Sequence, residues 1–324
     1  MHLLTTSDLP LPRSRVALIV NMGRPLETLA WGVSSRDLRP LPELKRATVQ
    51  AREVLASSGA TFIAALEAEA SDQALIAVVS FESGEVLTTP VALRVQVGHR
   101  LSYTLSPRLD QIVVAHSYAL PRTEHEEVGY ESARVDLVLA TAVGPAPVTK
   151  LATFNGFLYE EADDVAVQWS PARQQVACSV GVWRGTTAGF QPVLSIFDVS
   201  SSQVISTWDG LSLVGSASWR PDGEALLVRE FPRSPVFVMD VTTGHRTLIT
   251  GVSGTANVSS RGLPRPLGFA DASRLLIATQ RGQTMTLSAL DAGSGQVEAL
   301  VRFKGGVDMY PVVSSDLVSV LQGD

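Results

Sequence analysis

The chain has 324 residues, 45% hydrophobic and 18% charged, a composition that predicts a folded protein rather than a disordered one. Its formal net charge is −6, and its only lysines are Lys45, Lys150 and Lys304, so no basic patch predicts a nucleic-acid partner. The single cysteine, Cys178, excludes an internal disulfide and a cysteine-rich metal site.

Short apolar segments joined by turns follow one another along the whole chain. An apolar segment at 15–20 and a hairpin at 27–41 come first. Six similar hairpins follow, in which Ser, Pro, Asp and Gly form the turn and Val, Ile, Leu and Ala flank it, as buried strands require. They begin at Val54, Tyr103, Val167, Ala217, Leu267 and Pro311, for example as "VQWSPARQQVACSV" and "ASWRPDGEALLV".

A second hairpin follows each of the first five, as in "VLSIFDVSSSQVISTW" and "VFVMDVTTGHRTLI". In three of these hairpins an aspartate starts the turn, at Asp198, Asp240 and Asp291. Because an aspartate there can accept bonds from the following backbone N–H groups, we interpret these three residues as turn formers rather than as functional carboxylates.

Two hairpins in each repeat of about 50 residues give four strands, which is the period of a β-propeller blade. The sequence therefore predicts an all-β, six-bladed β-propeller as a single domain over residues 1–324, with seven blades as the alternative. Closing the ring with both chain ends would remove exposed sheet edges. The expected blades span 54–90, 102–151, 166–208, 216–250 and 266–302, and the sixth joins the N-terminal part 14–41 to the C-terminal part 308–324. The segment 15–20 would extend the closing blade or belong to a seventh.

The repeats resemble those of TolB-like and WD40-like bacterial β-propellers. The nearest copy is "WRPDG" at 219–223 with "DVTTG" at 240–244, followed by "WSP" at 169–171 with Asp198 and Val199. WD40 blades carry Trp-Asp at the end of the third strand, whereas Trp208 and Asp209 are expected after the fourth, so the TolB-like resemblance is favoured. This resemblance implies a scaffold, a partner-binding module or a hydrolase, and leaves the function open.

Sequence signatures of common enzymes are missing. The chain lacks a G-x-S-x-G elbow, a Walker loop and a dinucleotide fingerprint, and "HEEVG" at 125–129 has Gly129 where a zinc-binding H-E-x-x-H helix needs its second histidine. We therefore predict no catalytic residue, cofactor or metal. Cys178, in an apolar strand, and Trp169 and Trp219, before turns, are expected to be buried packing residues.

The long connections predict where a ligand would bind. Insertions at 117–133, 152–164, 181–192 and 251–266 all fall between the middle strands of a blade or between blades, and these connections open on one rim. Long loops on a rigid scaffold commonly carry binding residues.

The first two insertions combine acidic and aromatic residues, a mixture that is typical of protein interfaces. The candidate binding residues are Tyr118, Glu124, Glu126, Glu127, Tyr130, Phe157, Tyr159, Glu160 and Glu161, with Phe154 as a further aromatic anchor. The same residues could instead form solvated loops, or part of a divalent-metal site.

The sequence thus favours a non-catalytic scaffold that binds a protein or peptide at the loop-rich rim. The alternatives are a metal-dependent, lactonase-like propeller hydrolase and a small-ligand or carbohydrate sensor. No apolar run approaches the roughly 18 residues of a membrane span, and the N-terminus lacks a secretory leader pattern, so we expect a cytoplasmic protein without membrane contact.

Overall fold

The computed structural model describes part of the chain. Its backbone is described over residues 16–22, 27–32, 38–40, 53–57, 60–68, 74–80, 86–91, 100–107, 111–119, 131–141, 148–158, 165–183, 190–215, 218–231, 235–252, 264–282, 284–304 and 307–311. Side chains are described for most of these residues between 102 and 302. Within the described residues, no helix is both long and apolar enough to cross a membrane.

The described strands form antiparallel four-stranded sheets, most of which follow chain order. Three of them are β4(Glu53–Ser57), β5(Ala60–Ala68), β6(Ala74–Ser80) and β7(Val86–Val91); β8(Arg100–Leu105), β9(Gln111–Ala119), β10(Glu131–Thr141) and β11(Thr149–Leu158); and β12(Val165–Trp169), β13(Gln175–Trp183), β14(Phe190–Asp198) and β15(Gln203–Asp209). Two more are β16(Leu211–Leu213), β17(Ala225–Glu230), β18(Val236–Asp240) and β19(Arg246–Ile249); and β20(Arg265–Phe269), β21(Arg274–Arg281), β22(Thr284–Asp291) and β23(Val297–Lys304).

One further sheet contains strands from both ends of the sequence. Its order is β24(Val307–Pro311), β1(Val16–Met22), β2(Glu27–Gly32) and β3(Leu38–Pro40). Strand β24 pairs with β1 from Leu18 opposite Pro311 to Met22 opposite Val307. Residues 16–20 of the segment 15–20, for which more than one place was open, therefore lie in β1 of this sheet. The hairpin expected around Ser314 lies outside the described residues.

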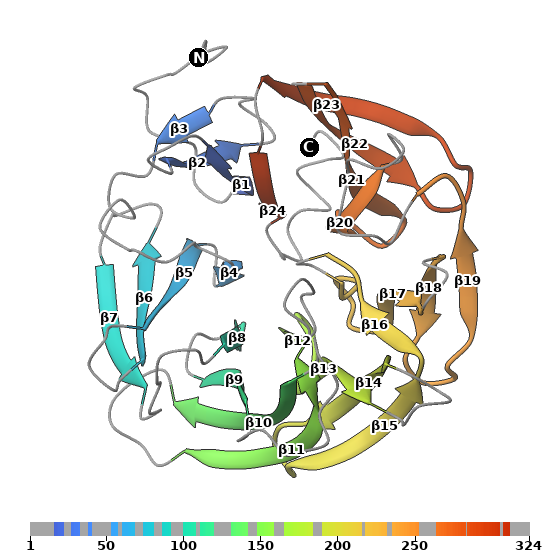
Figure 1. The fold of residues 1–324 in the computed structure, drawn as a ribbon. Coiled ribbons are helices and arrows are strands. Elements are labelled where there is room, and N and C mark those ends of the chain that lie inside the picture. Colours follow the sequence, from blue (N-terminus) through green and yellow to red (C-terminus); the bar gives the residue numbers. More distant parts are fainter. Residues whose placement is uncertain are drawn as a thin grey trace.

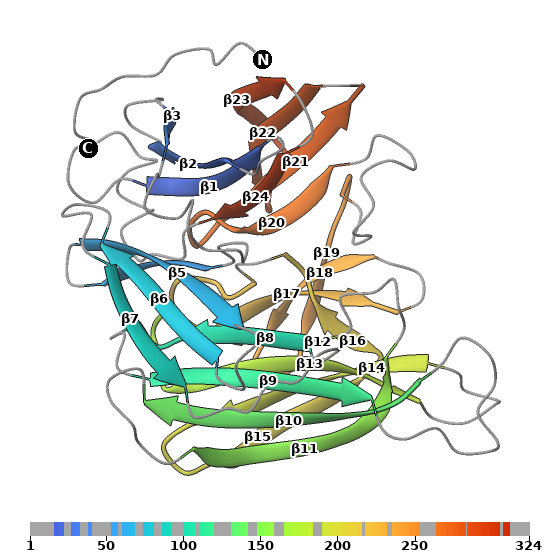
Figure 2. The same ribbon diagram turned by 60° about the vertical axis from the view of Figure 1, so that its left-hand side comes forward.

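The sheets are arranged radially around a common centre, in chain order (Figures 1 and 2). Strands β4, β8, β12, β16 and β20 lie nearest the centre, and β7, β11, β15, β19 and β23 lie on the outside (Figure 1). This radial arrangement of antiparallel sheets is that of a β-propeller.

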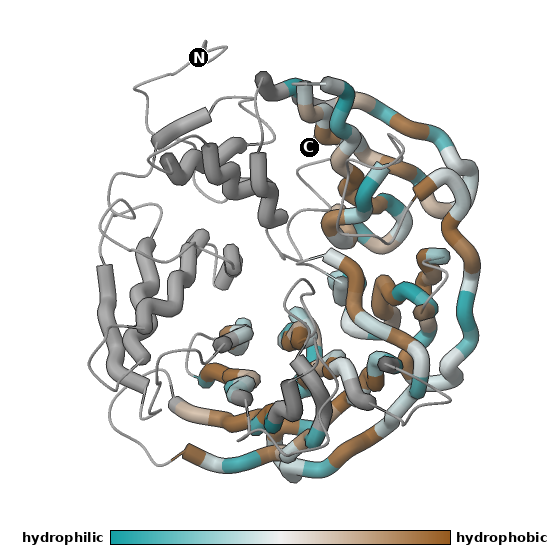
Figure 3. The backbone as a smooth tube through the Cα atoms, viewed as in Figure 1, coloured by the Kyte–Doolittle hydropathy of each residue, from teal (hydrophilic) through white to brown (hydrophobic). Residues whose placement is uncertain are grey.

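Apolar side chains hold neighbouring sheets together. Both faces of a middle strand are buried: Val176, Cys178 and Val180 of β13 pack with residues of the β8–β11 sheet, whereas Ala177 packs with residues of the β16–β19 sheet. A third cluster joins the β16–β19 sheet to the β20–β23 sheet through residues such as Phe269. These residues account for the hydrophobic stretches along the strands in Figure 3. Burial on both faces explains why the strands are apolar runs rather than alternating patterns.

Buried polar contacts also join the sheets near the centre. The hydroxyl of Thr104, on β8, accepts a bond from the backbone N–H of Trp169, on β12, at 2.8 Å. One sheet further, the side chain of Gln168 accepts a bond from the backbone N–H of Ser218 at 2.6 Å, and its amide nitrogen donates to the carbonyl of Gly215 at 2.9 Å. Thr104 and Gln168 occupy equivalent positions of their repeats, and each binds the backbone of the next sheet, Thr104 at β12 and Gln168 at the connection that follows β16.

The predictions for individual packing residues are confirmed. Trp169 and Trp219 are buried, and the indole nitrogen of Trp219 donates to the carbonyl of Gln168 at 3.0 Å. Cys178 is buried, and this burial raises the pKa of its thiol to about 12, so it is not a thiolate nucleophile at neutral pH. The sequence prediction was wrong in one detail. Trp208 lies within the fourth strand, β15, rather than after it.

The turn-forming role of the three aspartates is confirmed as well. Each carboxylate accepts bonds from the backbone N–H and hydroxyl groups of the residue three positions further on. The pairs are Asp198 with Ser201, Asp240 with Thr243, and Asp291 with Ser294. These backbone bonds are the largest cause of the lowered pKa of each of the three carboxyls.

Several outer strands carry a β-bulge. The extra residue is Leu151 in β11, Ile205 in β15 and Leu300 in β23. A bulge bends a strand and disrupts its hydrogen-bonding edge, which discourages pairing with another chain. The outer strands need this protection because Val204, Ile205, Leu248 and Val297 expose about half of their surface there.

Candidate functional site

The strand bounds place the four connections that the sequence identified as insertions on one rim, whereas the β16–β17 connection from Leu213 to Ala225, which is also long, lies on the opposite rim. One connection leaves β9 at Ala119 and enters β10 at Glu131, and the next leaves β11 at Leu158 and enters β12 at Val165. The β13–β14 and β19–β20 connections emerge on the same side, because strands alternate in direction through each sheet and into the next. This rim is the one that the sequence predicted to carry a binding site.

Most of the predicted binding residues lie outside the described part of the chain. They are Glu124, Glu126, Glu127, Tyr130, Tyr159, Glu160 and Glu161. The backbone of Phe157 is described in β11, where it pairs with Ser132 of β10. Phe154 is not a free anchor, because it packs edge-on against Phe197 in the core with ring centroids 6.3 Å apart.

Tyr118 belongs to a polar cluster at the base of the β9–β10 connection. We call this group the Asp136 cluster: Tyr118, Arg134, Asp136, Lys150 and Thr153. One carboxylate oxygen of Asp136 accepts from the Thr153 hydroxyl at 2.6 Å, the Lys150 ammonium at 3.0 Å and Arg134 Nε at 3.2 Å. Its other oxygen accepts from the Tyr118 hydroxyl at 3.2 Å. The cluster therefore links β9, β10 and β11 where the insertion leaves the sheet.

Strand alternation and one bulge bring these residues together. Val135 and Leu137 face the core shared with the β12–β15 sheet, so Arg134 and Asp136 face the other way. In a regular ladder Lys150 would lie opposite Leu139, on the core-side face. The extra residue Leu151 shifts Lys150 to a position opposite Val138, on the face of Asp136. Bulges commonly re-aim a side chain in this way.

The electrostatics of the cluster favour a charged Asp136. Burial by itself raises the pKa of this carboxyl, but hydrogen bonds from Thr153, Lys150 and Arg134 outweigh it and lower the pKa to about 2. Burial and the neighbouring Asp136 both raise the pKa of Tyr118, so its phenol stays protonated and acts as a donor. The ring of Tyr118 also lies 5.3 Å from that of His116, centroid to centroid, on the same strand.

Only part of this cluster could be identified from the sequence. Tyr118 was predicted to be a binding residue, but Asp136, Lys150 and Thr153 were not. The available signal was Asp136 itself, a charged residue inside the apolar strand "ARVDLVLAT". A charge in such a position requires partners when it is buried. The partners could not be identified, because the position of the bulge is not evident from the sequence.

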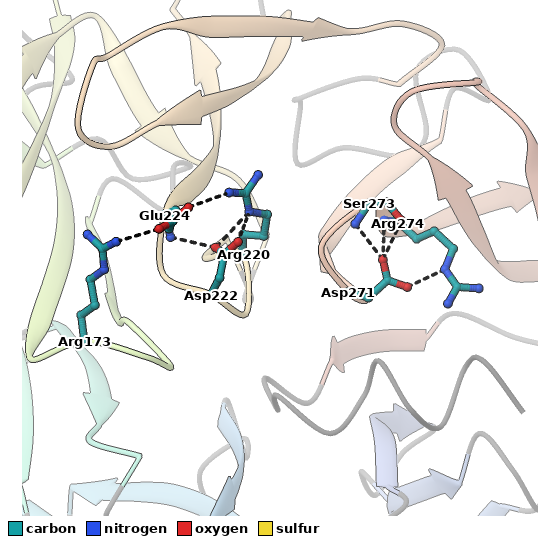
Figure 4. Close-up of polar contacts among 7 residues, drawn as sticks. All are labelled: Arg173, Arg220, Asp222, Glu224, Asp271, Ser273 and Arg274. Carbon is teal, nitrogen blue, oxygen red and sulfur yellow. Dashed lines mark hydrogen bonds and ion pairs between the residues drawn. The ribbon is translucent and has the colours of Figure 1, made fainter. Parts of the chain in front are cut away.

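The turns on the opposite rim bind their own charges. Between neighbouring sheets, Arg173 contacts Glu224 at 3.3 Å. Within the β16–β17 turn, Arg220 contacts Asp222 at 2.8 Å and Glu224 at 3.6 Å (Figure 4).

In the β20–β21 turn, Asp271 accepts bonds from the backbone of Ser273 and from Arg274 (Figure 4). Burial raises the pKa of Asp271, but these bonds outweigh it and lower the pKa overall. In these described turns, each arginine is thus paired with a carboxylate of the protein itself. In the described part of the chain, no group of three or more His, Cys, Asp or Glu side chains is placed to hold a metal ion.

Comparisons with known proteins identify the fold. No family model matches the chain, and no curated protein matches it. Among solved structures, TolB from Acinetobacter baumannii is similar with a TM-score of 0.59 and 15% identity, over 92% of this chain and 66% of that one. A protein assigned as TolB from Agrobacterium tumefaciens is similar with a TM-score of 0.50 and 12% identity, over 92% and 98% of the two chains.

The chain therefore has a TolB-like β-propeller fold, as its repeats predicted. It spans about two thirds of the length of the Acinetobacter protein. At these identities the similarity concerns the fold alone, and function has to be argued from the residues of this chain.

Proposed function

We propose that this protein is a non-catalytic interaction module that binds a protein or peptide at the rim carrying the long connections. The observation behind the proposal is the contrast between the two rims. Turns on one rim use their carboxylates to bind their own backbone and neighbouring arginines. The other rim carries the four connections that the sequence identified as insertions, including the one between Ala119 and Glu131. Loops held by a rigid scaffold are favourable positions for recognition.

The architecture that we propose for this module is a six-bladed propeller. Each four-stranded sheet would be one blade, and the pairing of β24 with β1 would close the ring. Closure would join the first and last parts of the chain in one sheet, would leave only the short edges of the innermost strands facing the centre, and would hold the rim rigid.

Closure can be tested by deletion of residues 307–324. We expect the shortened chain to aggregate or to unfold at a clearly lower temperature, because β1 loses β24, one of its two partner strands. Thermal unfolding followed by circular dichroism would measure this. A variant that stays monomeric with an unchanged melting temperature would refute closure by β24.

The chemistry of the insertions suggests what the partner presents. Glu124, Glu126 and Glu127 lie close together in sequence, and Tyr130 follows them. A partner with basic residues would be attracted to these carboxylates, and it would bury the aromatic side chains on docking. Such attraction acts over about 8 Å at physiological ionic strength and weakens as salt is added.

The test is surface plasmon resonance with a partner isolated by co-purification. Replacing Glu124, Glu126 and Glu127 together by lysine should slow association and reduce its salt dependence, while leaving stability unchanged. Tyr130→Ala should speed dissociation instead. The control is Glu298→Lys. This change removes a carboxylate from the outer strand β23, which is far along the chain from the substituted connection. If all the rim variants bind like the control, the insertions do not form the docking surface.

A further inference from the structure

The Asp136 cluster has more positive charge than its single carboxylate can balance. Arg134 and Lys150 both contact the same oxygen of Asp136, so two cations share one anion. We propose that these two residues form a second binding surface, on the flank of the β8–β11 sheet, for the carboxylate groups of an acidic peptide segment. This surface lies on the sheet at the base of the β9–β10 connection, and it would recognise the opposite charge from the one proposed for the rim.

The hydrogen-bond donors of Arg134 and Lys150 support a surface that binds acceptor groups. A guanidinium carries five N–H donors and an ammonium carries three. Arg134 uses Nε for Asp136, and Lys150 uses one donor for the same oxygen, which also accepts from Thr153. Both cationic side chains reach solvent, with 38% of Arg134 and 48% of Lys150 exposed. Their remaining N–H groups can therefore bind a carboxylate, and a guanidinium can do so with two parallel bonds.

The imbalance is particular to this cluster among the ion pairs of the described residues. Arg173 and Arg220 are balanced by Asp222 and Glu224. The other pairs, Arg246 with Glu230 and Arg274 with Asp271, each join one cation to one carboxylate. A local positive excess on a chain with a net charge of −6 is therefore an exception.

The bulge in β11 creates this excess of positive charge. Without the extra residue Leu151, Lys150 would face the core side of the sheet, and Arg134 and Asp136 would form a neutral pair. Asp136 also has two partners besides Lys150, because Thr153 and Arg134 both donate to it.

A short acidic peptide fits this surface better than a nucleic acid. The net charge of −6 repels a long polyanion, whereas a segment with one or two carboxylates encounters mainly the local field of Arg134 and Lys150. Tyr118, which donates to Asp136 beside them, gives an aromatic face next to the two cations.

The experiment is fluorescence anisotropy with a labelled, glutamate-containing hexapeptide, at low and at physiological salt. We expect Arg134→Gln and Lys150→Gln each to weaken binding about two- to fivefold, the effect typical of an exposed ion pair. Arg173→Gln is the matched control, since Arg173 is an exposed arginine that also contacts a carboxylate, and it should leave binding unchanged. Asp136→Asn should strengthen binding, because it removes the internal competitor for both cations.

Two further probes distinguish the sources of the anion. Inorganic phosphate should displace the peptide only weakly, and a labelled oligothymidylate should bind less tightly than the peptide. Unchanged binding in both Arg134→Gln and Lys150→Gln would overturn the proposal. So would stronger binding of the oligonucleotide, or displacement by phosphate at the peptide's own concentration. Circular dichroism would verify that each variant is folded. If Asp136→Asn does not fold, Arg134→Gln and Lys150→Gln still decide whether the two cations bind the peptide.

Discussion

Gln168 offers a direct test of how the sheets are joined. Its side chain lies between the innermost strands of two sheets, accepts from the backbone N–H of Ser218 at 2.6 Å and donates to the carbonyl of Gly215 at 2.9 Å. The change Gln168→Met keeps nearly the same shape and removes both bonds. The structure therefore predicts a loss of stability that arises from hydrogen bonding rather than from packing.

The magnitude follows from the burial of the two partners. Ser218 is completely buried, so its backbone N–H has no access to water, and leaving it unpaired costs about 1–3 kcal/mol. Gly215 is exposed, so its carbonyl can bind water and adds little to this cost. We expect Gln168→Met to reduce the free energy of unfolding by about 2 kcal/mol, a sizeable part of the roughly 5–15 kcal/mol of a whole domain.

Urea unfolding followed by tryptophan fluorescence would measure this loss, because the buried indole of Trp219 contacts the backbone of Gln168. The control is Gln203→Met, on the outer strand β15, where the side chain is exposed. Equal unfolding midpoints for the two variants would refute the argument, since they would mean that the inter-sheet bonds add nothing to stability.

Three further variants test other parts of the structure. Gly215→Ala should destabilise the protein more than the control Gly210→Ala. Both glycines have a φ of 76°, but only an added Cβ at Gly215 would collide with the backbone of β20. In urea unfolding, Gly210→Ala should cost about 1–2 kcal/mol. Trp219→Ala should cost about 3–5 kcal/mol and Trp208→Ala clearly less, since Trp219 is 1% exposed and Trp208 is only partly buried; equal losses would contradict the packing. Asp136, whose pKa is lowered to about 2, should add about 2 kcal/mol of stability that is fully present above about pH 4 and is lost as the pH falls towards 2. Asp136→Asn should lack this pH dependence in acid unfolding followed by circular dichroism, and an identical pH profile in both proteins would exclude the role of the cluster.

Local chemistry explains how much of the fold could be predicted from the sequence. The turn "WRPDG" combines a proline, an aspartate and a glycine, and Gly223 indeed adopts a φ of 72°. The Asp240 turn follows the same logic with its own backbone bonds. These signals depend only on neighbouring residues and recur about every 50 residues, and this spacing identified the propeller.

The candidate site depends on longer-range relations, which is why only part of it could be predicted. Tyr118 was predicted as an aromatic residue within the insertion 117–133, but its partner Asp136 lies on the next strand and Lys150 on the one after. Their contact requires the register of three strands and one bulge, neither of which is encoded by a local pattern. The same is true of Gln168, whose partner Ser218 lies in another sheet.

Polar residues that hold the scaffold together differ from Arg134 and Lys150 in the number of hydrogen-bonding groups that remain for a partner. Gln168 and the turn aspartates have their bonding capacity taken up by backbone groups, so they serve the scaffold and offer little to a ligand. Arg134 and Lys150 reach solvent and share one acceptor, so their capacity to donate exceeds what the fold uses. Unused bonding capacity on a rigid sheet is available to a partner without a large ordering cost. That surplus, rather than charge alone, distinguishes a residue that can bind a ligand from one that only stabilises the propeller.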